Sequence, residues 1–166
     1  MWTYSAREVY INMSLAYTVK GTAEDIFFRI VKDEPSFKTE KGGAGGTSRT
    51  FEPNSDYSVY ITLPQTSPTN EVLSLLHTLD ETTRRGAFPF FAKDASGKSL
   101  FFSPITYIVR RPDVSYGSGI EEYEWELKAT DMVFSAHGNE QQQGPFGDID
   151  TLVDLVAQYG TNMGII

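Results

Sequence analysis

Residues 41–50, KGGAGGTSRT, hold four glycines in five positions between a lysine and an arginine. Such a loop could cradle a phosphate with its backbone N–H groups, or it could be a flexible arm that reaches a neighbour. A P-loop needs a lysine and a hydroxyl residue directly after the last glycine, followed by a helix. Here Thr47 and Ser48 follow Gly46, and a strand-like piece that ends at Pro53 comes next. Because glycine backbones are permissive, the sequence predicts a mobile connector here. Its residues are Lys41, Gly42, Gly43, Ala44, Gly45 and Gly46.

Elsewhere in the sequence, no group of residues matches the pattern of a nucleophilic site or of a histidine-based metal site. YGSGI, at 116–120, lacks the G-x-S-x-G spacing of a nucleophile elbow and lies between two strand-like runs, so a hairpin turn is predicted. His77 and His137 are the two histidines, and they form neither a triad nor a two-histidine metal site. A site built from carboxylates alone stays open. We expect no catalytic residue, no cofactor and no metal ligand.

The most informative constellation is EEYEWELKA, at 121–129. Because strand side chains alternate between two faces, one face of this segment consists of Glu122, Glu124, Glu126 and Lys128. The opposite face consists of Tyr123, Trp125, Leu127 and Ala129. We predict that the aromatic face is core and that Trp125 anchors it. The glutamate row then faces water, pairs across the hairpin with Arg110 and Arg111, and keeps enough charge to disfavour anionic ligands.

Most of the remaining chain is typical of strands, because short apolar or alternating runs are separated by turn residues. The predicted strands lie in 8–15, 25–34, 57–63, 88–94, 98–112 and 119–134. Alternation places Val9, Ile11 and Met13 on one face of the first run. It places Tyr57, Val59, Ile61 and Leu63 on one face of the third. A turn at Ala95-Ser96-Gly97 joins the fourth run to the fifth.

One helix is predicted within 66–86. Ser67 suits the N-cap, Pro68 suits the first helical position, and Gly86 can end the helix after two arginines. The spacing i, i+3, i+4, i+7 predicts an apolar stripe of Val72, Leu75, Leu76 and Leu79. A second, short helix is predicted within 148–160, after a polar, glycine-rich linker.

The predicted fold class is therefore α+β and mainly β, with antiparallel sandwich or barrel-forming sheets flanked by one helix, plus a short C-terminal helix. The domain boundaries are 1–139 for the β domain and 140–166 for a C-terminal extension. The 166 residues contain no cysteine, which excludes disulfides and makes a reducing site of synthesis the simpler assumption. No apolar run approaches a membrane-spanning length, and no signal peptide is visible.

The net charge of −8 is unevenly distributed. Residues 1–112 carry 13 Lys and Arg against 12 Asp and Glu, whereas residues 113–166 carry one lysine against 10 acids. A solvated acidic surface explains this, and so does a surface that repels an anion. The balance argues against a nucleic-acid-binding groove, which needs clustered Lys and Arg.

Four stretches, taken together in their order and spacing, resemble the tail tube proteins of contractile-tailed bacteriophages. The most specific piece is LPQTSPTNEVLSLL, followed by KDASGKSLFF and EYEWELKATDM, and the resemblance covers about residues 20–139. It implies a β-sandwich with a flanking helix, of which six copies form a ring with a continuous inner β-barrel. Stacked rings form a tube that carries the genome into the host, inside a contractile sheath.

The resemblance further implies a virion protein of the phage tail, made in the host cytoplasm. Its partners would be other copies of itself and the sheath, baseplate and tail terminator proteins, and double-stranded DNA would pass without stable binding. The glycine run would be an inter-subunit loop, and Glu122, Glu124 and Glu126 would face the lumen or the outer surface. Alternatives are a tube terminator or baseplate ring protein of the same fold, or a carbohydrate-binding β-sandwich module. No membrane partner is expected.

Overall fold

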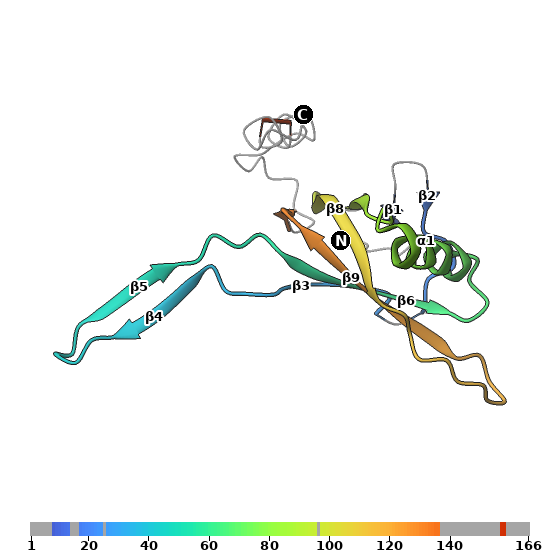
Figure 1. The fold of residues 1–166 in the computed structure, drawn as a ribbon, viewed down its shortest axis with the longest axis horizontal. Helices are drawn as coiled ribbons and strands as arrows, with labels where there is room; N and C mark the ends of the chain where they lie inside the picture. The colour runs from blue at the N-terminus through green and yellow to red at the C-terminus, as the bar shows by residue number, and fades with distance from the viewer. Residues whose placement is uncertain (1–7, 14–16, 25, 96, 137–156, 159–166) are drawn as a thin grey trace, which may run out of the picture.

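The computed structural model describes residues 8–13, 17–24, 26–95, 97–136 and 157–158 (Figure 1). Within these residues the chain forms ten strands and one helix longer than a turn. In chain order they are β1 (Val9–Met13), β2 (Tyr17–Thr18), β3 (Phe28–Lys32), β4 (Phe37–Lys41), β5 (Thr47–Phe51), β6 (Tyr57–Pro64), α1 (Thr69–Thr83), β7 (Phe88–Asp94), β8 (Leu100–Arg110), β9 (Glu122–Thr130) and β10 (Val133–Ser135).

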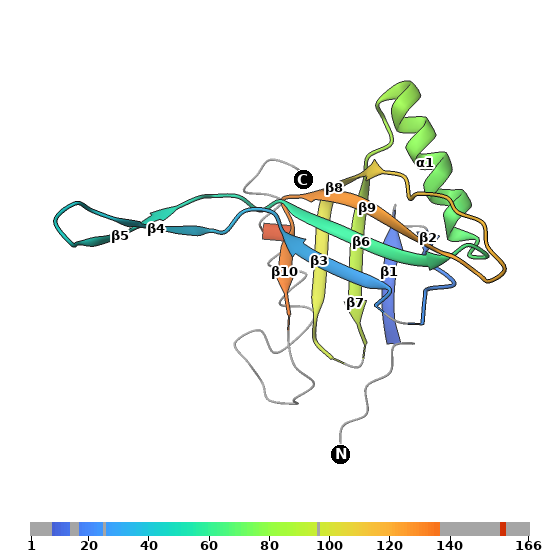
Figure 2. The same cartoon turned by 90° about the horizontal axis from the view of Figure 1, so that it is seen from below.

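Eight of these strands form one antiparallel sheet in the order β2-β1-β7-β8-β9-β6-β3, with β10 beside the first part of β8. The register shifts between Phe88 and Phe90 and again between Ile108 and Arg110, and such irregularities bend strands. Strands β1 and β7 consequently run across β9, β6 and β3 (Figure 2), and the two halves of the sheet enclose the core. The predicted class, α+β and mainly antiparallel β, is confirmed.

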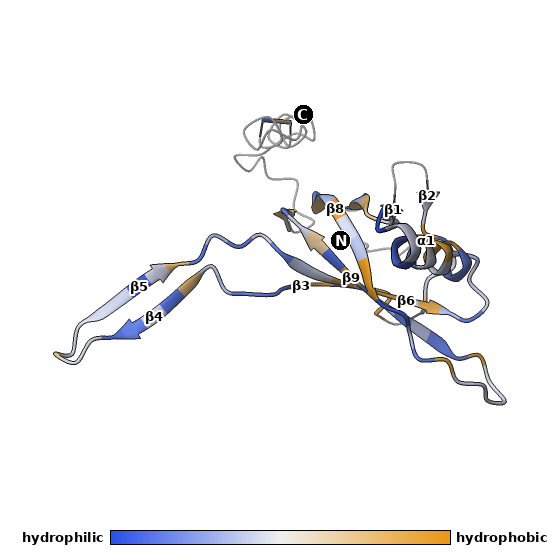
Figure 3. Cartoon of the chain, viewed as in Figure 1, coloured by the Kyte–Doolittle hydropathy of each residue, from blue (hydrophilic) through white to orange (hydrophobic). Residues whose placement is uncertain are grey.

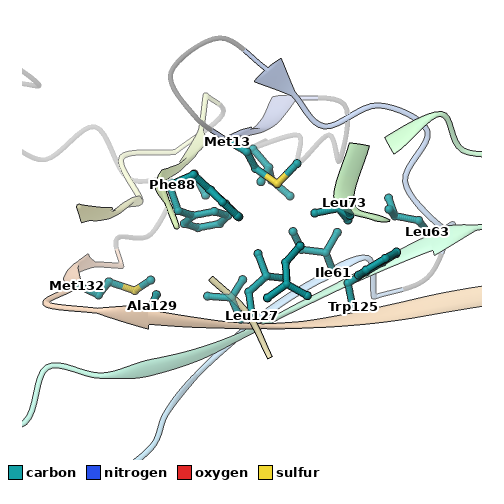
Figure 4. Close-up of a cluster of buried hydrophobic side chains, with 14 residues drawn as sticks. Met13, Ile61, Leu63, Leu73, Phe88, Trp125, Leu127, Ala129 and Met132 are labelled. Atoms are coloured by element: carbon teal, nitrogen blue, oxygen red, sulfur yellow. The ribbon is translucent and has the colours of Figure 1, made fainter. Parts of the chain in front are cut away.

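Period-two alternation explains which side chains enter this core. The apolar face predicted for β6 is buried at Val59, Ile61 and Leu63, each 0% exposed, while Tyr57 is half-buried. Ile11 and Met13 are buried from β1. Figure 4 shows side chains of both sheet halves and of α1 meeting in one cluster. The turn predicted between the fourth and fifth runs contains Ser96, which lies outside the described residues, but the two strands on either side of it, β7 and β8, are antiparallel neighbours.

α1 starts one residue later than predicted, because Pro68 is the N-cap and Thr69 is the first helical residue. The Ser67 hydroxyl still accepts a hydrogen bond from the Thr69 backbone N–H at 3.3 Å, and it donates to the Lys20 carbonyl at 2.6 Å. The Thr69 hydroxyl also donates to that carbonyl, at 2.9 Å, and accepts from the Lys20 N–H at 3.0 Å. These bonds tie the first turn of α1 to the segment after β2.

The prediction of which face of α1 is buried is wrong. The fully buried residues are Thr69 and Leu73, whereas Leu75 is 64% exposed and Leu79 is 46% exposed. Leu76 is half-buried and packs against the core. Val72 is half-buried as well, so the buried face runs through Thr69, Leu73 and Leu76, at i, i+4 and i+7, and Leu73 rather than Leu75 faces the sheet.

The end of α1 also differs from the prediction. Arg84, not Gly86, adopts the left-handed conformation that stops the helix, with φ 57° and ψ 33°. Gly86 is needed for a different reason, because a Cβ there would lie 2.4 Å from the Asp80 Cβ and 2.7 Å from the Leu76 carbonyl oxygen. The Gly86 N–H donates to the Asp80 carboxylate at 3.0 Å.

The glycine run is not a connector without regular structure. β4 and β5 pair along their whole length, and the run forms the turn between them, with Gly42 and Gly46 joined by an N–H to carbonyl bond of 2.8 Å. Gly45 has φ +83°, which favours glycine. This hairpin, residues 37–51, projects from one end of the body (Figure 1), and we call it the arm.

Two predictions about the C-terminal region fall mainly outside the described residues. Of the helix predicted within 148–160, only Ala157 and Gln158 are described, and both are helical. The domain boundary at 139/140 lies outside the described residues altogether.

Candidate functional site

The glutamates of β9 line a groove on the outer face of the sheet. Because Trp125 and Leu127 point into the core, alternation turns Glu122, Glu124 and Glu126 outward. The groove has a volume of about 360 Å³. We call it the glutamate groove, and it is lined by Tyr60, Arg110, Arg111, Pro112, Asp113, Glu122, Glu124 and Glu126.

The glutamates differ in how far they are neutralised. Glu126 pairs with Arg110 at 3.2 Å, as the sequence predicts for adjacent strands. Glu124 lies 3.9 Å from Arg29 of β3, whose guanidinium also stacks on the Tyr60 ring at 4.2 Å from its centroid. Glu122 forms no ion pair with any described residue. Pairing therefore weakens from one end of the row to the other.

Arg111 does not join this ladder, contrary to the prediction. It turns to the helix instead, where its Nε donates to His77 Nδ1 at 3.0 Å and its Nη2 lies 3.4 Å from the Glu81 carboxylate. Nη2 also donates to the Thr78 hydroxyl at 2.8 Å. The chain leaves the sheet after Arg110, so the next side chain reaches α1. His77, predicted as a boundary residue, is the point of attachment.

Lys128 lies on the same face as the glutamates but is occupied elsewhere. It forms an ion pair with Asp33, at the root of the arm, and both side chains are mostly buried. The Ser58 hydroxyl donates to the same Asp33 carboxylate at 2.5 Å. Lys128 therefore holds the root of the arm against β9, and the glutamate groove keeps a net negative charge.

Sequence reasoning missed Arg29 and Asp33 as neighbours of this face. Both belong to the segment around β3, which reaches the groove because β3 pairs with β6 and β6 pairs with β9. No spacing along the chain indicates that order of strands. The alternation of β9 itself was the signal that located the groove.

The arm presents two different faces. The register pairs Phe37 with Phe51 and Thr39 with Arg49, and these residues share one face with Lys41. The Phe37 and Phe51 rings lie 5.4 Å apart, and the Arg49 guanidinium stacks 4.2 Å from the Phe37 centroid. Phe37 is 49% exposed and Phe51 is 61% exposed. The arm therefore carries an exposed aromatic and basic face, which we call the aromatic face of the arm.

Two further observations concern only the part of the chain that the structure describes. Its Asp, Glu and His side chains include no group of three or more that could hold a metal ion. Its helical residues include no stretch long and apolar enough to cross a membrane. His137 lies outside the described residues.

The fold is similar to that of chains in two solved assemblies. It is similar to the anti-feeding prophage cap, the AFP tube terminating cap, with a TM-score of 0.56, 7% identity and coverage of 82% of this chain and 93% of that chain. It is also similar to a chain from the virion of the native gene transfer agent particle, with a TM-score of 0.50, 15% identity and coverage of 81% and 100%. At these identities the likeness shows a shared fold alone.

Sequence similarity shows the family. The chain is 32% identical over 161 residues to Structural protein ORF10 of Pseudomonas phage KPP10, covering 92% of this chain and 91% of that protein. The chain belongs to the family of this bacteriophage structural protein, and its place is in the virion. No model of a known protein family matches the chain. The predicted phage structural class is confirmed at this level.

Proposed function

We propose that the protein is the subunit of a phage tail tube, in which six copies form a ring and stacked rings make a conduit for the genome. Membership of a phage structural family and a fold shared with a tube terminating cap support this role. So does the outer face of β9, which is rich in carboxylates. The role requires no catalysis.

The single observation that carries the proposal is the open edge of the sheet at β3, close to the carboxylate-rich face of β9. Among the described strands, β3 pairs with β6 alone, and its Arg29 and Val31 are exposed. Exposed edges invite pairing with another chain, so a natural protein covers them or uses them. Joining such edges around a ring would continue the sheet from copy to copy and turn one face of every copy inward.

In this arrangement Glu122, Glu124 and Glu126 line the lumen. DNA presents one negative charge per roughly 1.7 Å of its axis, so a basic lumen would grip it at every step. A carboxylate-lined wall lets it pass without stable binding. The outer surface would contact the sheath, and the ends of the tube would contact the baseplate and the tail terminator. The arm, with Lys41 to Gly46 at its tip, would reach a neighbouring copy.

The test is a phage that carries Glu122→Lys, Glu124→Lys and Glu126→Lys together. If the row lines the lumen, tubes assemble but DNA ejection is slow or incomplete. The matched control replaces the same residues with glutamine, which keeps their shape and removes the charge without reversing it, and ejection should stay close to normal. If the row lies outside, sheath attachment fails and ejection through intact tubes is unchanged, which contradicts the lumen role.

A second candidate role is a tube terminator, favoured by the likeness to the AFP tube terminating cap. The two roles differ in copy number, since a tube subunit repeats along the whole tail and a terminator forms a single ring. Quantitative mass spectrometry of purified particles distinguishes them. A copy number equal to that of one ring would exclude the tube subunit role.

A further inference from the structure

The molecule has a second exposed apolar surface, at the end opposite to the arm. The loop between β8 and β9, residues 111–121, extends beyond the sheet (Figure 1). Its apolar side chains point to solvent, with Val114 60%, Tyr116 85% and Ile120 68% exposed. Most exposed apolar residues of a monomer lie singly, whereas three within one short loop mark an interaction site.

The arm and this loop carry opposite charges. Residues 37–51 contain three basic residues and one acidic residue, for a net charge of +2. Residues 111–121 contain two acidic residues, Asp113 and Glu121, and one basic residue, Arg111, for a net charge of −1. Arg111 is already paired with Glu81 of α1, which leaves the two acids as the charges of the outer part of the loop. Both segments therefore combine exposed apolar side chains with charge, and the signs are complementary.

On the arm, the charge and the apolar surface coincide on one face. Arg49 and Lys41 share the aromatic face with Phe37 and Phe51, whereas Glu40, the acid of the arm, lies on the opposite face. Figure 3 shows hydrophobic residues gathered where the arm leaves the body, with more polar residues further out. Arginine and aromatic side chains are the residues that contribute most at protein interfaces.

We propose that the aromatic face of the arm of one copy docks on the β8–β9 loop of a second copy. Tyr116, Val114 and Ile120 would pack against the Phe37 and Phe51 rings, and Asp113 and Glu121 would lie beside Lys41 and Arg49. Because the two surfaces lie at opposite ends of the molecule, the contact is heterologous and repeats from copy to copy. The inference rests on the proposed self-assembly and names the surfaces that join.

The experiment uses two charge-reversed variants of the full chain. The arm variant carries Lys41→Glu and Arg49→Glu, and the loop variant carries Asp113→Lys and Glu121→Lys. Each variant alone sets like charges against each other, so its critical concentration for assembly should rise by about tenfold or more in sedimentation velocity. A mixture of the two in equal amounts restores opposite charges at every contact and should assemble like the parent, as an alternating array.

The controls separate this contact from other causes. Lys38→Glu with Lys98→Glu makes the same change of charge on the other face of the arm and at a distant turn, and it should leave assembly unchanged. Thermal melting of the unassembled arm and loop variants should match that of the parent, because the changed residues lie outside the core. Negative-stain microscopy shows whether the parent forms rings or tubes.

Two outcomes overturn the proposal in different ways. If the parent assembles and each variant alone assembles equally well, or if the mixture stays unassembled, the docking of arm on loop is refuted while the tube role stands. If the parent itself stays monomeric at every salt and protein concentration, the docking contact and the proposed function are both refuted.

Discussion

Replacing Trp125 with alanine should destabilise the protein by about 3–5 kcal/mol, the usual cost of truncating a large core aromatic side chain. Trp125 is 2% exposed and packs in the cluster that joins both halves of the sheet. Its indole N–H donates to the Asn70 side-chain oxygen at 2.9 Å, and Asn70 in turn donates to the Pro64 carbonyl at 2.9 Å. The substitution thus removes both core volume and a link from β9 to α1.

Part of the stability lost in Trp125→Ala comes from the hydrogen bond between the indole N–H and Asn70. Trp125→Phe keeps an aromatic ring in the core but removes the donor, and Asn70→Ala removes the acceptor. A double-mutant cycle between these two changes should give a coupling free energy of about 1 kcal/mol. A coupling near zero would mean that the indole N–H contributes nothing to stability through Asn70.

The assay is thermal unfolding by circular dichroism, at a protein concentration at which the parent sediments as a monomer. For a chain of this length the expected loss lowers the melting temperature by about 6–20 °C. Glu124→Ala is the matched control, one residue away on the opposite face of β9, and should change stability by no more than about 0.5 kcal/mol. If Trp125→Ala melts like the parent, or if Trp125→Ala and Glu124→Ala lower the melting temperature equally, the assignment of the two faces of β9 is refuted.

Three further predictions concern stability. Gly86→Ala should cost about 1–3 kcal/mol in chemical denaturation, because its Cβ would lie 2.4 Å from the Cβ of a helix aspartate, whereas Gly43→Ala, with nothing within 4 Å, should be neutral. Asp33→Ala leaves the mostly buried Lys128 unpaired and should cost about 1–2 kcal/mol, between the values for exposed and buried pairs; an unchanged melting temperature would contradict this. Burial raises the pKa of Tyr57 above 10.0, so the unfolded chain releases that proton first and stability falls as the pH rises above about 10. Tyr57→Phe should reduce this alkaline loss in melts recorded against pH, and an identical pH profile would refute the assignment.

Local patterns predicted several features correctly. The buried faces of β1 and β6 follow from alternation at Ile11, Met13 and Val59. The helix start follows to within one residue from the hydroxyl of Ser67 and the proline after it, since Pro68 is the N-cap and the Ser67 hydroxyl accepts from the Thr69 N–H. Each of these features depends on residues a few positions apart, so the sequence near them contains the needed information.

Other features depend on partners that are distant in the chain. The apolar spacing in α1 predicted a stripe through Leu75, but in the fold Thr69 of the first turn bonds to Lys20 and Leu73 is buried instead. Arg111 was expected beside the glutamates, but the chain turns away from the sheet and Arg111 meets His77 on α1. Periodicity shows how wide an apolar face is, and long-range contacts decide which way it points.

The sequence by itself determined that this chain is a mainly β protein with one helix, that glutamates and aromatic residues occupy opposite faces of one strand, and that it belongs among phage structural proteins. Side-chain alternation is a local property of the backbone, so these faces need no knowledge of the fold. Only the tertiary structure decided that β3 lies beside β6, which brings Arg29 to Glu124 and Asp33 to Lys128. It also decided that the glycine run closes a projecting hairpin opposite the β8–β9 loop. Strand pairing joins segments far apart in the chain, and their register is set by packing and turns rather than by any spacing within one segment.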